Sequence, residues 1–581
     1  MQLTLEQRLL RFLEREEHGE ARTHRELQAQ PIDVREQEGQ CIPAVRFVGT
    51  DGTRFRFRAL ENQSKFRTGD AVLVSDGTDL EGAMPMSYEH YDGARGELIL
   101  LRDAYVRTRG EEFVVGAEYV LDRRSIGLRG RLTEVVRAAF ENPLLSALLA
   151  GDHVVLSDGA RHKRAHDQLR TIGLNEAQLA AGAFAIATES LALVQGPPGT
   201  GKTRLLAEVV AALCRSGCRV GLTAFTNLAV SNALLAIRRV APELPLFKVA
   251  SNKNGFDSEL REAGVQLVDP RRGRLPERGV VVAGTCFQIQ KLAEQVRFHY
   301  SVFDEAGQLP IPHALACMLR SNRWLMFGDH LQLPPVVTAE HKDLLARASI
   351  FEYLHDRYGS QLLNTTYRMN DGVCRVVGDT FYGGRLQPTP EAAGRRMPFR
   401  PGGRLDDLLD PASSVVWMRI DHMQPGSSSP EEAAAVADVV ADLVRQHGLL
   451  PADVAVIAPF RSQVRAVRSA LQHKGIPGSE LIVVDTVDRI QGQEREVVVI
   501  SLATGDPDQT RSRNGAFHLS ENRLNVAISR ARTKVVLVAS SHAFAALPSD
   551  ALGLRAASKS RDLRDRLVAF DYTALYCAAK A

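Results

Sequence analysis

Apolar positions recur with different spacings along the chain, and each spacing predicts a different kind of element. Within residues 1–40 they recur every three or four positions, which predicts a helix with one buried face. These side chains are Leu5, Leu9, Phe12 and Leu13. Gly19 follows where such a helix is expected to end.

Residues 41–125 instead show short stretches in which apolar and polar residues alternate. The turn signals TDGT and SDGT separate these stretches, and no helical stretch intervenes. Five or six such strands predict a small antiparallel β-barrel. In TRFRFR, Phe55 and Phe57 would face one way and the arginines the other, where a solvated outer face is favoured over a nucleic-acid contact.

From residue 171 onward, apolar strands alternate with amphipathic helices in two successive series. Such alternation predicts an α/β fold in which parallel sheets are covered by helices on both faces. In the second series Ser429 is a suitable N-cap, Pro430 a suitable first helical residue and Gly448 a suitable stop for one helix. The stretch LNVAISRAR, residues 524–532, is interpreted as a strand.

Composition narrows the class of protein. A length of 581 residues exceeds that of one ordinary domain, and the net charge of +3 means that any nucleic-acid affinity would come from a local groove. No apolar run approaches the roughly 20 residues of a membrane span, and the amphipathic, acidic N-terminus is unlike a targeting signal. Seven scattered cysteines favour a reducing compartment, so we expect a cytoplasmic protein.

One segment has the form of a phosphate-binding loop. The stretch LALVQGPPGTGKTRLL joins a predicted strand to a predicted helix, and its loop is GPPGTGKT. The loop residues are Gly196, Pro197, Pro198, Gly199, Thr200, Gly201, Lys202 and Thr203. Backbone N–H groups and the start of the helix would hold phosphates, Lys202 would reach the β and γ phosphates of ATP, and the Thr203 hydroxyl would bind Mg²⁺.

Two further predicted strands end in polar residues that suit ATP hydrolysis. In YSVFDEAG, Asp304 is suited to hold Mg²⁺, and Glu305 is suited to orient and deprotonate the attacking water. In FGDHLQLPP, Gln332 follows Asp329 at a position where a polar side chain could sense the γ phosphate.

Six segments in order, GPPGTGKT, FDEAG, GDHLQLPP, NTTYRM, VDTVDRIQGQE and RLNVAISRAR, resemble the helicase motifs of superfamily 1. Over residues 171–540 the chain is similar, more narrowly, to the 1B branch. This is the up-frameshift-like group that contains the nonsense-decay, senataxin and immunoglobulin-mu-binding helicases. Phe225 and Ser529 are mild departures from its pattern.

The resemblance implies an architecture of two tandem RecA-like domains with a small N-terminal barrel carried on stalk helices. The implied parts are a stalk helix at 1–40, the barrel at 41–125, further stalk helices at 126–165, a RecA-like domain at 166–361 with a short insertion at 237–280, a second RecA-like domain at 362–545, and a helical tail at 546–581.

The resemblance also implies roles for single residues. Gln178 would read the adenine edge and Tyr367 would stack on the base. Arg368 and Arg530 would be arginine fingers from the second domain, while Glu494 and Gly492 would lie near the γ phosphate. The residues that would face the nucleic-acid strand are Thr226, Asn227, Thr285, Pro459, Phe460 and Thr486.

The resemblance leads us to expect an ATP-dependent helicase or translocase on single-stranded DNA or RNA, and it implies movement from 5′ to 3′. It would use ATP and Mg²⁺, act as a monomer, and have its task set by protein partners. One alternative is an ATP-gated clamp or remodeller that barely unwinds. A non-catalytic scaffold with a decayed ATPase is a weaker alternative, because Lys202, Asp304 and Glu305 are all intact.

Overall fold

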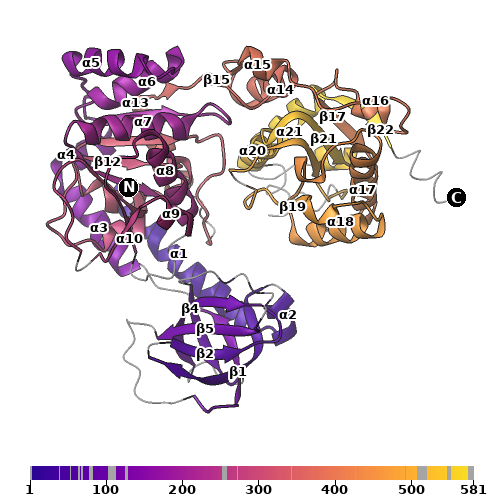
Figure 1. Ribbon diagram of the computed structural model, residues 1–581, viewed down its shortest axis with the longest axis horizontal. Helices are drawn as coiled ribbons and strands as arrows, with labels where there is room; N and C mark the ends of the chain where they lie inside the picture. The colour runs from indigo at the N-terminus through magenta and orange to yellow at the C-terminus, as the bar shows by residue number, and fades with distance from the viewer. Residues whose placement is uncertain are drawn as a thin grey trace.

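The computed structural model contains a β-barrel and two domains that are each built on a parallel sheet (Figure 1). It describes residues 3–37, 39–52, 54–62, 64, 66, 70–77, 83–93, 95–102, 113–124, 129–250, 258–270, 273–339, 341, 343–424, 427–490, 492–506, 520–545 and 551–572. Parts of the expected barrel, and residues 546–550 and 573–581 of the expected tail, lie outside these. Among the described residues, no helix combines the length and the apolar character that crossing a membrane requires.

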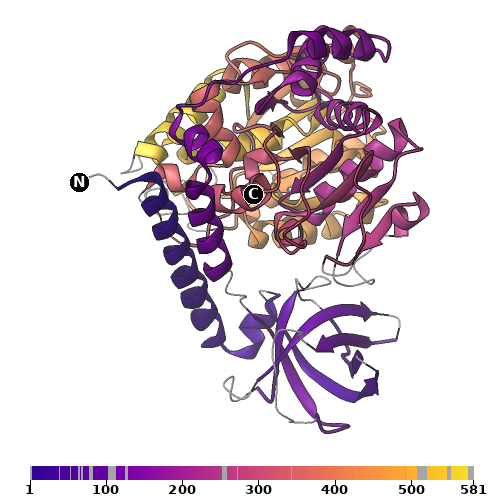
Figure 2. The same ribbon diagram turned by 90° about the vertical axis from the view of Figure 1, so that its left-hand side faces the viewer.

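Long helices join the barrel to the first sheet domain. α1 (Leu5–Gln28) runs down to the barrel and packs against α3 (Arg129–Glu141), as Figure 2 shows. The short helix α2 (Ile32–Gln37) leads into the barrel, and α4 (Pro143–Ala150) follows α3.

The prediction that the first helix ends at Gly19 is wrong, because α1 continues to Gln28. A Cβ atom at Gly19 would lie 2.8 Å from the Ala339 Cβ and 3.0 Å from the Ala339 Cα. Glycine at this position therefore permits close packing between the helix and the first sheet domain, at a conformational cost within the helix.

The predicted antiparallel barrel is confirmed. In the part of the chain that the structure describes, its strands close in the order β1-β2-β5-β4-β3-β6. They are β1 (Cys41–Asp51), β2 (Arg54–Arg58), β3 (Ala71–Ser75), β4 (Met84–Asp92), β5 (Glu97–Arg102) and β6 (Glu118–Arg123).

The two faces of β2 differ as its sequence predicts. Phe57 is buried inside the barrel, whereas the arginines of β2 are exposed. Arg54 lies 3.3 Å from Glu89 and Arg56 lies 3.6 Å from Glu97. This pairing with acidic side chains supports a solvated outer face.

The first domain contains a parallel sheet in the order β10-β9-β11-β8-β12-β13-β7-β14. Its strands are β7 (Leu191–Gln195), β8 (Arg219–Ala224), β9 (Leu246–Val249), β10 (Gln266–Val268), β11 (Val280–Thr285), β12 (Tyr300–Phe303), β13 (Trp324–Gly328) and β14 (Gln361–Leu362). Its helices include α5 (Gly159–Arg170), α6 (Glu176–Ala187), α7 (Lys202–Arg215), α8 (Asn227–Val240), α9 (Ser258–Glu262), α10 (Cys286–Gln290), α11 (Ile311–Met318), α12 (Leu344–Arg347) and α13 (Ile350–Tyr358).

Strand β7 is buried on both faces, and successive side chains enter different cores. Leu191 and Leu193 pack in a cluster with residues of α1, α3 and α4, while Ala192 and Val194 pack in a cluster with residues of α6, α7 and α8. The stalk helices therefore cover one face of the first sheet, which fixes the barrel's attachment relative to the phosphate loop.

Residues 237–280 differ from the expected short insertion. They contain the end of α8, the small helix α9, and strands β9 and β10. Both strands pair in parallel at the edge of the first sheet beside β11. Much of this segment is therefore a continuation of the α/β pattern.

The second domain contains a sheet in the order β19-β18-β20-β21-β17-β22. Its strands are β17 (Val415–Arg419), β18 (Val454–Ala458), β19 (Val483–Thr486), β20 (Arg495–Ser501), β21 (Ala531–Ala539) and β22 (Val568–Asp571). Its helices include α14 (Asp371–Phe381), α15 (Pro390–Ala393), α16 (Asp406–Leu409), α17 (Pro430–Arg445), α18 (Arg461–His473), α20 (Glu521–Ile528) and α21 (Ala551–Asp565). A small pair, β15 (Thr365–Thr366) and β16 (Gln387–Pro388), lies between the two sheets in the chain.

Ser429 caps α17 as predicted, since its hydroxyl accepts the Glu432 N–H. The helix ends at Arg445, slightly before the predicted stop at Gly448. The interpretation of residues 524–532 as a strand is wrong over its first part, because Leu524–Ile528 belong to α20. The predicted fold class, two parallel-sheet domains with an N-terminal barrel on helices, is confirmed.

Candidate nucleotide site and nucleic-acid cleft

The phosphate loop lies between β7 and α7, as its sequence predicts. Gly199 and Gly201 have φ angles of +73° and +75°, a region that favours glycine. A Cβ at Gly199 would lie 2.5 Å from the Arg368 Cβ. The Thr366 hydroxyl donates to the Pro198 carbonyl over 3.0 Å, and the Tyr367 N–H donates to the Gly199 carbonyl over 2.8 Å. The loop therefore contacts the segment that leads into the second domain.

Three ionisable side chains meet at the end of β12. The Lys202 Nζ lies 2.8 Å from the Glu305 Oε1, and Asp304 is buried beside them. Burial lowers the pKa of Lys202, but Glu305, Asp304 and Asp329 act against it, so the net pKa lies above the usual lysine value. Burial raises the pKa of Asp304 to about 6, an effect that Lys202 opposes and Glu305 reinforces.

Glu305 has an unusual backbone conformation. Its φ of +50° places it in the left-handed region, which non-glycine residues seldom adopt. Its N–H donates to the Asp304 Oδ1 over 2.9 Å. Backbone strain of this kind concentrates at functional sites, where it presents a side chain in a direction that regular structure would not allow.

Gln332 lies on the loop that follows β13. Its Nε2 donates to the Asp329 Oδ2 over 2.7 Å and lies 3.4 Å from the Gly196 carbonyl oxygen. The side chain is thus held beside the phosphate loop by a buried carboxylate, where it could report on what the loop holds.

The second domain contributes two arginines to this site. The Arg368 Nε donates to the Glu494 Oε2 over 2.7 Å, and its Nη1 donates to the Ser529 carbonyl over 3.0 Å. Arg530 is buried, and its Nη1 makes one long contact, 3.4 Å, with the Gln493 carbonyl. The Arg530 Nε has no hydrogen-bond partner among the described residues.

The predicted adenine-side residues are adjacent to the loop but are engaged with protein groups. Gln178 is buried, its Nε2 donates to the Thr200 carbonyl over 2.9 Å, and its Oε1 accepts the Asn175 N–H over 3.1 Å. Tyr367 is exposed, and its hydroxyl accepts a hydrogen bond from the Asn175 Nδ2 over 2.9 Å. Tyr367 is therefore partly accessible at the edge of the loop, whereas Gln178 stabilises the loop itself.

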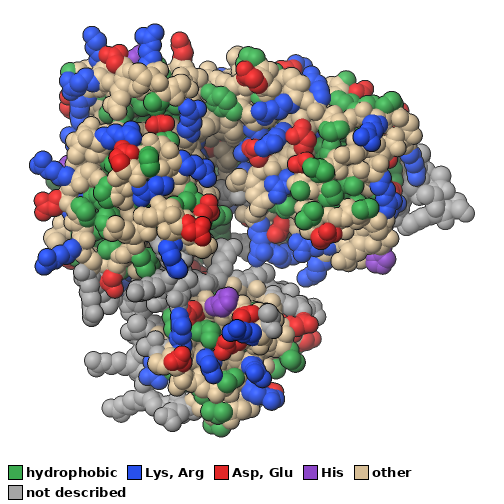
Figure 3. Space-filling model, viewed as in Figure 1, with side chains coloured by type: hydrophobic (Ala, Val, Ile, Leu, Met, Phe, Trp, Pro, Cys, Tyr) green, Lys and Arg blue, Asp and Glu red, His purple; other side chains and the backbone are tan. Residues whose placement is uncertain are grey.

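One cavity of about 860 Å³ is bordered by the phosphate loop, the acidic pair and the two arginines, whereas Gln178, Tyr367 and Glu494 do not line it. The surface is hollowed between the two sheet domains, above the barrel (Figure 3). Of the predicted residues, those lining this cavity are residues 196–203 of the loop, Thr226, Asp304, Glu305, Gln332, Arg368, Gly492 and Arg530. Ser64 and Phe66 of the barrel line it too, so all three parts of the molecule border it.

The predicted strand-facing residues lie mainly where helices begin or strands end. Thr226 is the N-cap of α8 and accepts the Ala229 N–H over 3.2 Å, and Asn227 follows it. Pro459 and Phe460 precede α18, and Thr486 ends β19. Thr285 is the buried N-cap of α10, with its N–H donated to Gln288, so a structural role accounts for it without a ligand.

The residues suited to hold Mg²⁺ are Asp304 and Thr203. Among the described residues no cluster of three or more His, Cys, Asp or Glu side chains could hold a metal ion alone. A buried carboxylate, one hydroxyl and a phosphate loop instead fit an ion shared with a nucleotide. The glycine cradle and the unpaired Arg530 Nε likewise fit a bound polyphosphate.

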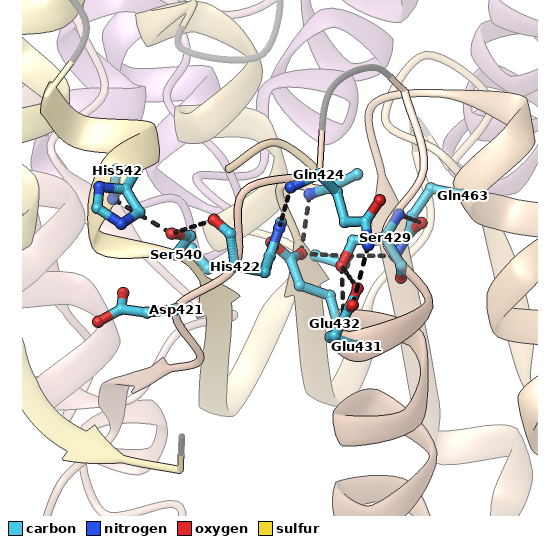
Figure 4. Close-up of polar contacts among 12 residues, drawn as sticks. Asp421, His422, Gln424, Ser429, Glu431, Glu432, Gln463, Ser540 and His542 are labelled. Atoms are coloured by element: carbon cyan, nitrogen blue, oxygen red, sulfur yellow. Dashed lines mark hydrogen bonds and ion pairs between the residues drawn. The ribbon is translucent and has the colours of Figure 1, made fainter. Parts of the chain in front are cut away.

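A second polar cluster, which the sequence did not reveal, lies beside the ends of β17 and β20 (Figure 4). The Glu432 Oε1 lies 3.0 Å from the His422 Nε2, and its Oε2 accepts the Ser501 hydroxyl over 2.6 Å and the Ala503 N–H over 2.8 Å. Gln463 joins Ser501 to the start of α17. Of these residues, only Gln463 lies close in the chain to predicted site residues, namely Pro459 and Phe460. The spacing of residues in the sequence therefore could not have identified this cluster.

Two family models match the part of the chain that forms the two sheet domains. Residues 173–271 and 274–340 match the family AAA_11, and residues 346–542 match the family AAA_12; both are described as an AAA domain. Together the two families cover more than half of the chain.

Similar curated proteins include two helicase/nucleases. The DNA replication ATP-dependent helicase/nuclease JHS1 of Arabidopsis thaliana is 28% identical over 396 residues, which cover 64% of this chain and 29% of that protein. The DNA replication ATP-dependent helicase/nuclease DNA2 of Homo sapiens is 27% identical over 425 residues, which cover 64% of this chain and 38% of that protein. This chain thus spans about a third of the length of these relatives.

Among solved structures, the arterivirus nonstructural protein 10 helicase in complex with DNA is similar over 83% of this chain and 74% of that chain, with 15% sequence identity and a TM-score of 0.38. The phosphate loop, its buried acidic pair and the two family matches lead to one conclusion. The chain contains the AAA_11 and AAA_12 domains of superfamily 1 helicases, is an ATPase, and is distantly related to the DNA2 helicase/nucleases.

Proposed function

We propose that this ATPase is a motor of the 1B, up-frameshift-like branch that moves 5′ to 3′ along single-stranded nucleic acid. The observation that supports this most directly is the shared cavity, which the phosphate loop, Arg530 of the second domain and Phe66 of the barrel all border. An ATP site that opens into the cleft between two domains allows nucleotide binding and release to change the spacing of those domains.

The residues of this cavity divide into distinct roles. Lys202 and the loop N–H groups would hold phosphates, Asp304 and Thr203 would hold Mg²⁺, and Glu305 would accept a proton from the attacking water. Bound Mg²⁺ would neutralise charge on the phosphates. Lys202 now contacts Glu305, so this ion pair keeps the base oriented toward the phosphate loop.

Arg368 and Arg530 would complete the site from the second domain, so that hydrolysis depends on domain closure. Gln332 would report the presence of the γ phosphate to the second domain, and Glu494 would orient Arg368 through their 2.7 Å contact. Tyr367 would stack on the base, and Gln178 would hold the loop that lies against it.

The strand would lie between the two domains, along Thr226, Asn227, Pro459, Phe460 and Thr486. Hydroxyl, amide and apolar groups of this kind suit contacts to phosphate, sugar and base faces without reading sequence. Lys and Arg side chains gather on the second domain where it faces the barrel (Figure 3), which would favour a polyanion at that border. Groups of this kind would bind either DNA or RNA. The motor would act as a monomer, and protein partners would determine its biological task.

Unwinding of tailed duplexes tests this function. The protein would be mixed with duplexes that carry a single-stranded tail at either the 5′ or the 3′ end, made of DNA or RNA, with Glu305→Gln as the inactive control. We expect ATP-dependent opening of the 5′-tailed duplex. Opening only from a 3′ tail would contradict the direction, and polymer-stimulated hydrolysis without opening of either duplex would favour the ATP-gated clamp.

A further inference from the structure

A buried hydrogen-bond network joins the first domain to the second beside the nucleotide site. Asp329, at the end of β13, is buried, and its Oδ1 accepts the Gln195 Nε2 over 3.0 Å. Its Oδ2 accepts the Gln332 Nε2 over 2.7 Å and the Tyr382 hydroxyl over 2.6 Å. Tyr382 follows α14 and is buried in the core of the second domain. One carboxylate oxygen thus connects Gln332 to a side chain of the other domain.

Helix α20 extends this network towards Arg530. The Asn525 Nδ2 donates to the Tyr382 hydroxyl over 2.9 Å and to the Leu331 carbonyl over 2.8 Å. The Asn522 Nδ2 donates to the His330 carbonyl over 3.0 Å and to the Gln332 carbonyl over 2.5 Å. The helix ends at Ile528, just before Arg530 enters the cavity. One helix therefore contacts the loop carrying Gln332 near its start and delivers Arg530 near its end.

Because the network is buried, breaking its hydrogen bonds would cost more free energy than breaking exposed ones. Hydrogen bonds to a charged acceptor are shorter and stronger than those between neutral groups, and a buried acceptor that loses its donor pays the full loss of solvation. Leu333, on the same loop, packs into the core cluster of the second domain that also contains Tyr382. Separation of the two domains would have to break these contacts, so they favour the arrangement in which both domains border the cavity.

We propose that Tyr382 is a positioning residue that couples the two halves of the ATPase site. Its hydroxyl, bonded to Asp329 and Asn525, aligns the loop of Gln332 with α20, so that Gln332 and Arg530 face the same phosphate. Any change of the Gln332 loop is thereby passed to α20, which ends just before Arg530. The part of this inference that concerns nucleic-acid stimulation rests on the proposed function, whereas the part that concerns hydrolysis needs only the ATPase.

Tyr382→Phe tests the proposal, with Tyr353→Phe as its matched control. Tyr353 is also buried and its hydroxyl also makes one short hydrogen bond, 2.6 Å to the Leu149 carbonyl, but this bond lies between the first domain and the stalk. Steady-state kcat and KM for ATP would be measured without polymer and with single-stranded DNA or RNA. We expect Tyr382→Phe to lower kcat roughly 10-fold with KM changed less than about twofold, and Tyr353→Phe to change neither.

A double variant separates coupling from simple destabilisation. If Tyr382 acts through Gln332, Tyr382→Phe should lower kcat much less in a Gln332→Ala background than in the wild type, because neighbours in one network are not additive. Wild-type kcat in Tyr382→Phe, equal losses in Tyr353→Phe, or full additivity with Gln332→Ala would each overturn the proposal. If no polymer stimulates the wild type, the proposed function fails, but the comparison without polymer still tests the role of Tyr382.

Discussion

The acidic side chains around Arg530 do not fully balance its positive charge. Burial, together with the neighbouring Arg368, lowers the pKa of Arg530 to about 9, and Glu305 and Glu494 only partly oppose this. Its Nε has no hydrogen-bond partner among the described residues. A buried cation with an unused donor is costly unless an anion arrives. The position of this cation in the wall of the cavity makes a phosphate the fitting anion.

Arg530→Ala should therefore abolish most hydrolysis without weakening the fold. We expect kcat to fall roughly 10³-fold, as for the loss of an arginine finger, while the melting temperature stays equal or rises because a buried charge is removed. Arg532→Ala is the control, since Arg532 is half-exposed and donates to the Glu494 Oε1 over 3.1 Å from the other side. The kcat of Arg532→Ala should stay within about tenfold of the wild-type value. Equal losses in the two variants would argue against a specific role for Arg530.

Asp304 predicts a pH dependence of nucleotide binding. Its pKa of about 6 means that the carboxylate is ionised at pH 7 and becomes protonated as the pH falls through 6. Because only the ionised form can bind Mg²⁺, the Kd for Mg²⁺-ADP should rise about tenfold per pH unit below pH 6 and stay flat above pH 7. Calorimetric titrations of ADP with chelated Mg²⁺ are the control, since they share the titration of the nucleotide itself. The same slope in both titrations would contradict the role of Asp304.

The sequence predicted some residues of the site but not others. Lys202, Asp304 and Glu305 were identified because a loop between a strand and a helix, and an acidic pair after an apolar strand, are local patterns that the fold preserves. Tyr382 and Glu432 could not be identified, because they form hydrogen bonds with side chains that are distant in the chain. The contact of Gln178 with Thr200 was missed for the same reason.

At the scale of elements, α1 is fastened to the first domain by both charge and close packing. The Glu16 carboxylate accepts hydrogen bonds from the Thr338 N–H over 2.8 Å and from the Ala339 N–H over 2.9 Å. The Glu16 Oε1 also lies 2.6 Å from the His341 Nε2. Arg8 forms an ion pair with Asp343. Gly19 lies directly against Ala339. The helix that carries the barrel is thereby held against the loop that follows Gln332 in the chain.

Gly19→Ala should loosen this contact although alanine favours helices. The new Cβ would approach the Ala339 Cβ to 2.8 Å, and relieving that overlap should outweigh the helical gain and destabilise the local contact by about 1 kcal/mol. The Thr338 and Ala339 amide hydrogens should then exchange roughly fivefold faster. Gly130→Ala in α3 is the control, because a Cβ there would meet nothing within 4 Å. Unchanged exchange in Gly19→Ala would show that the loop yields without cost.

Elements were predicted well where periodicity and burial agree and poorly where they do not. Strands such as β7, which is buried along its whole length and apolar in its first four residues, were identified correctly. In α20, Leu524, Val526 and Ile528 alternate as in a strand, but the helix is buried among neighbours on several sides, so its apolar residues do not show one helical face. Gly19 was taken as a stop because its packing partner lies far away in the sequence.

At the scale of the whole molecule, the chain enters and leaves the barrel at neighbouring points. The Arg123 N–H, at the end of β6, donates to the Gln40 carbonyl, just before β1, over 3.0 Å. The barrel nevertheless borders the shared cavity through Ser64 and Phe66. It can therefore influence what occupies the cleft while remaining separable from both sheets.

Replacing residues 41–122 by a short Gly-Ser linker should separate hydrolysis from work on the strand. We expect basal ATP turnover within about threefold of the full chain, because the catalytic groups lie on the two sheet domains. Binding of single-stranded nucleic acid or duplex opening should fall by about tenfold or more, because one wall of the cleft is lost. Fluorescence anisotropy and strand-separation assays provide these values. Unchanged duplex opening would exclude a role for the barrel.

The most direct test of the central claim is steady-state ATP hydrolysis without polymer, with single-stranded DNA and with single-stranded RNA. Glu305→Gln serves as the blank, since it should bind ATP yet hydrolyse it at least about 100-fold more slowly. We predict strong stimulation of the wild-type protein by at least one polymer, which would also identify the track. Turnover that is indifferent to both polymers would contradict a motor that moves along a nucleic-acid strand.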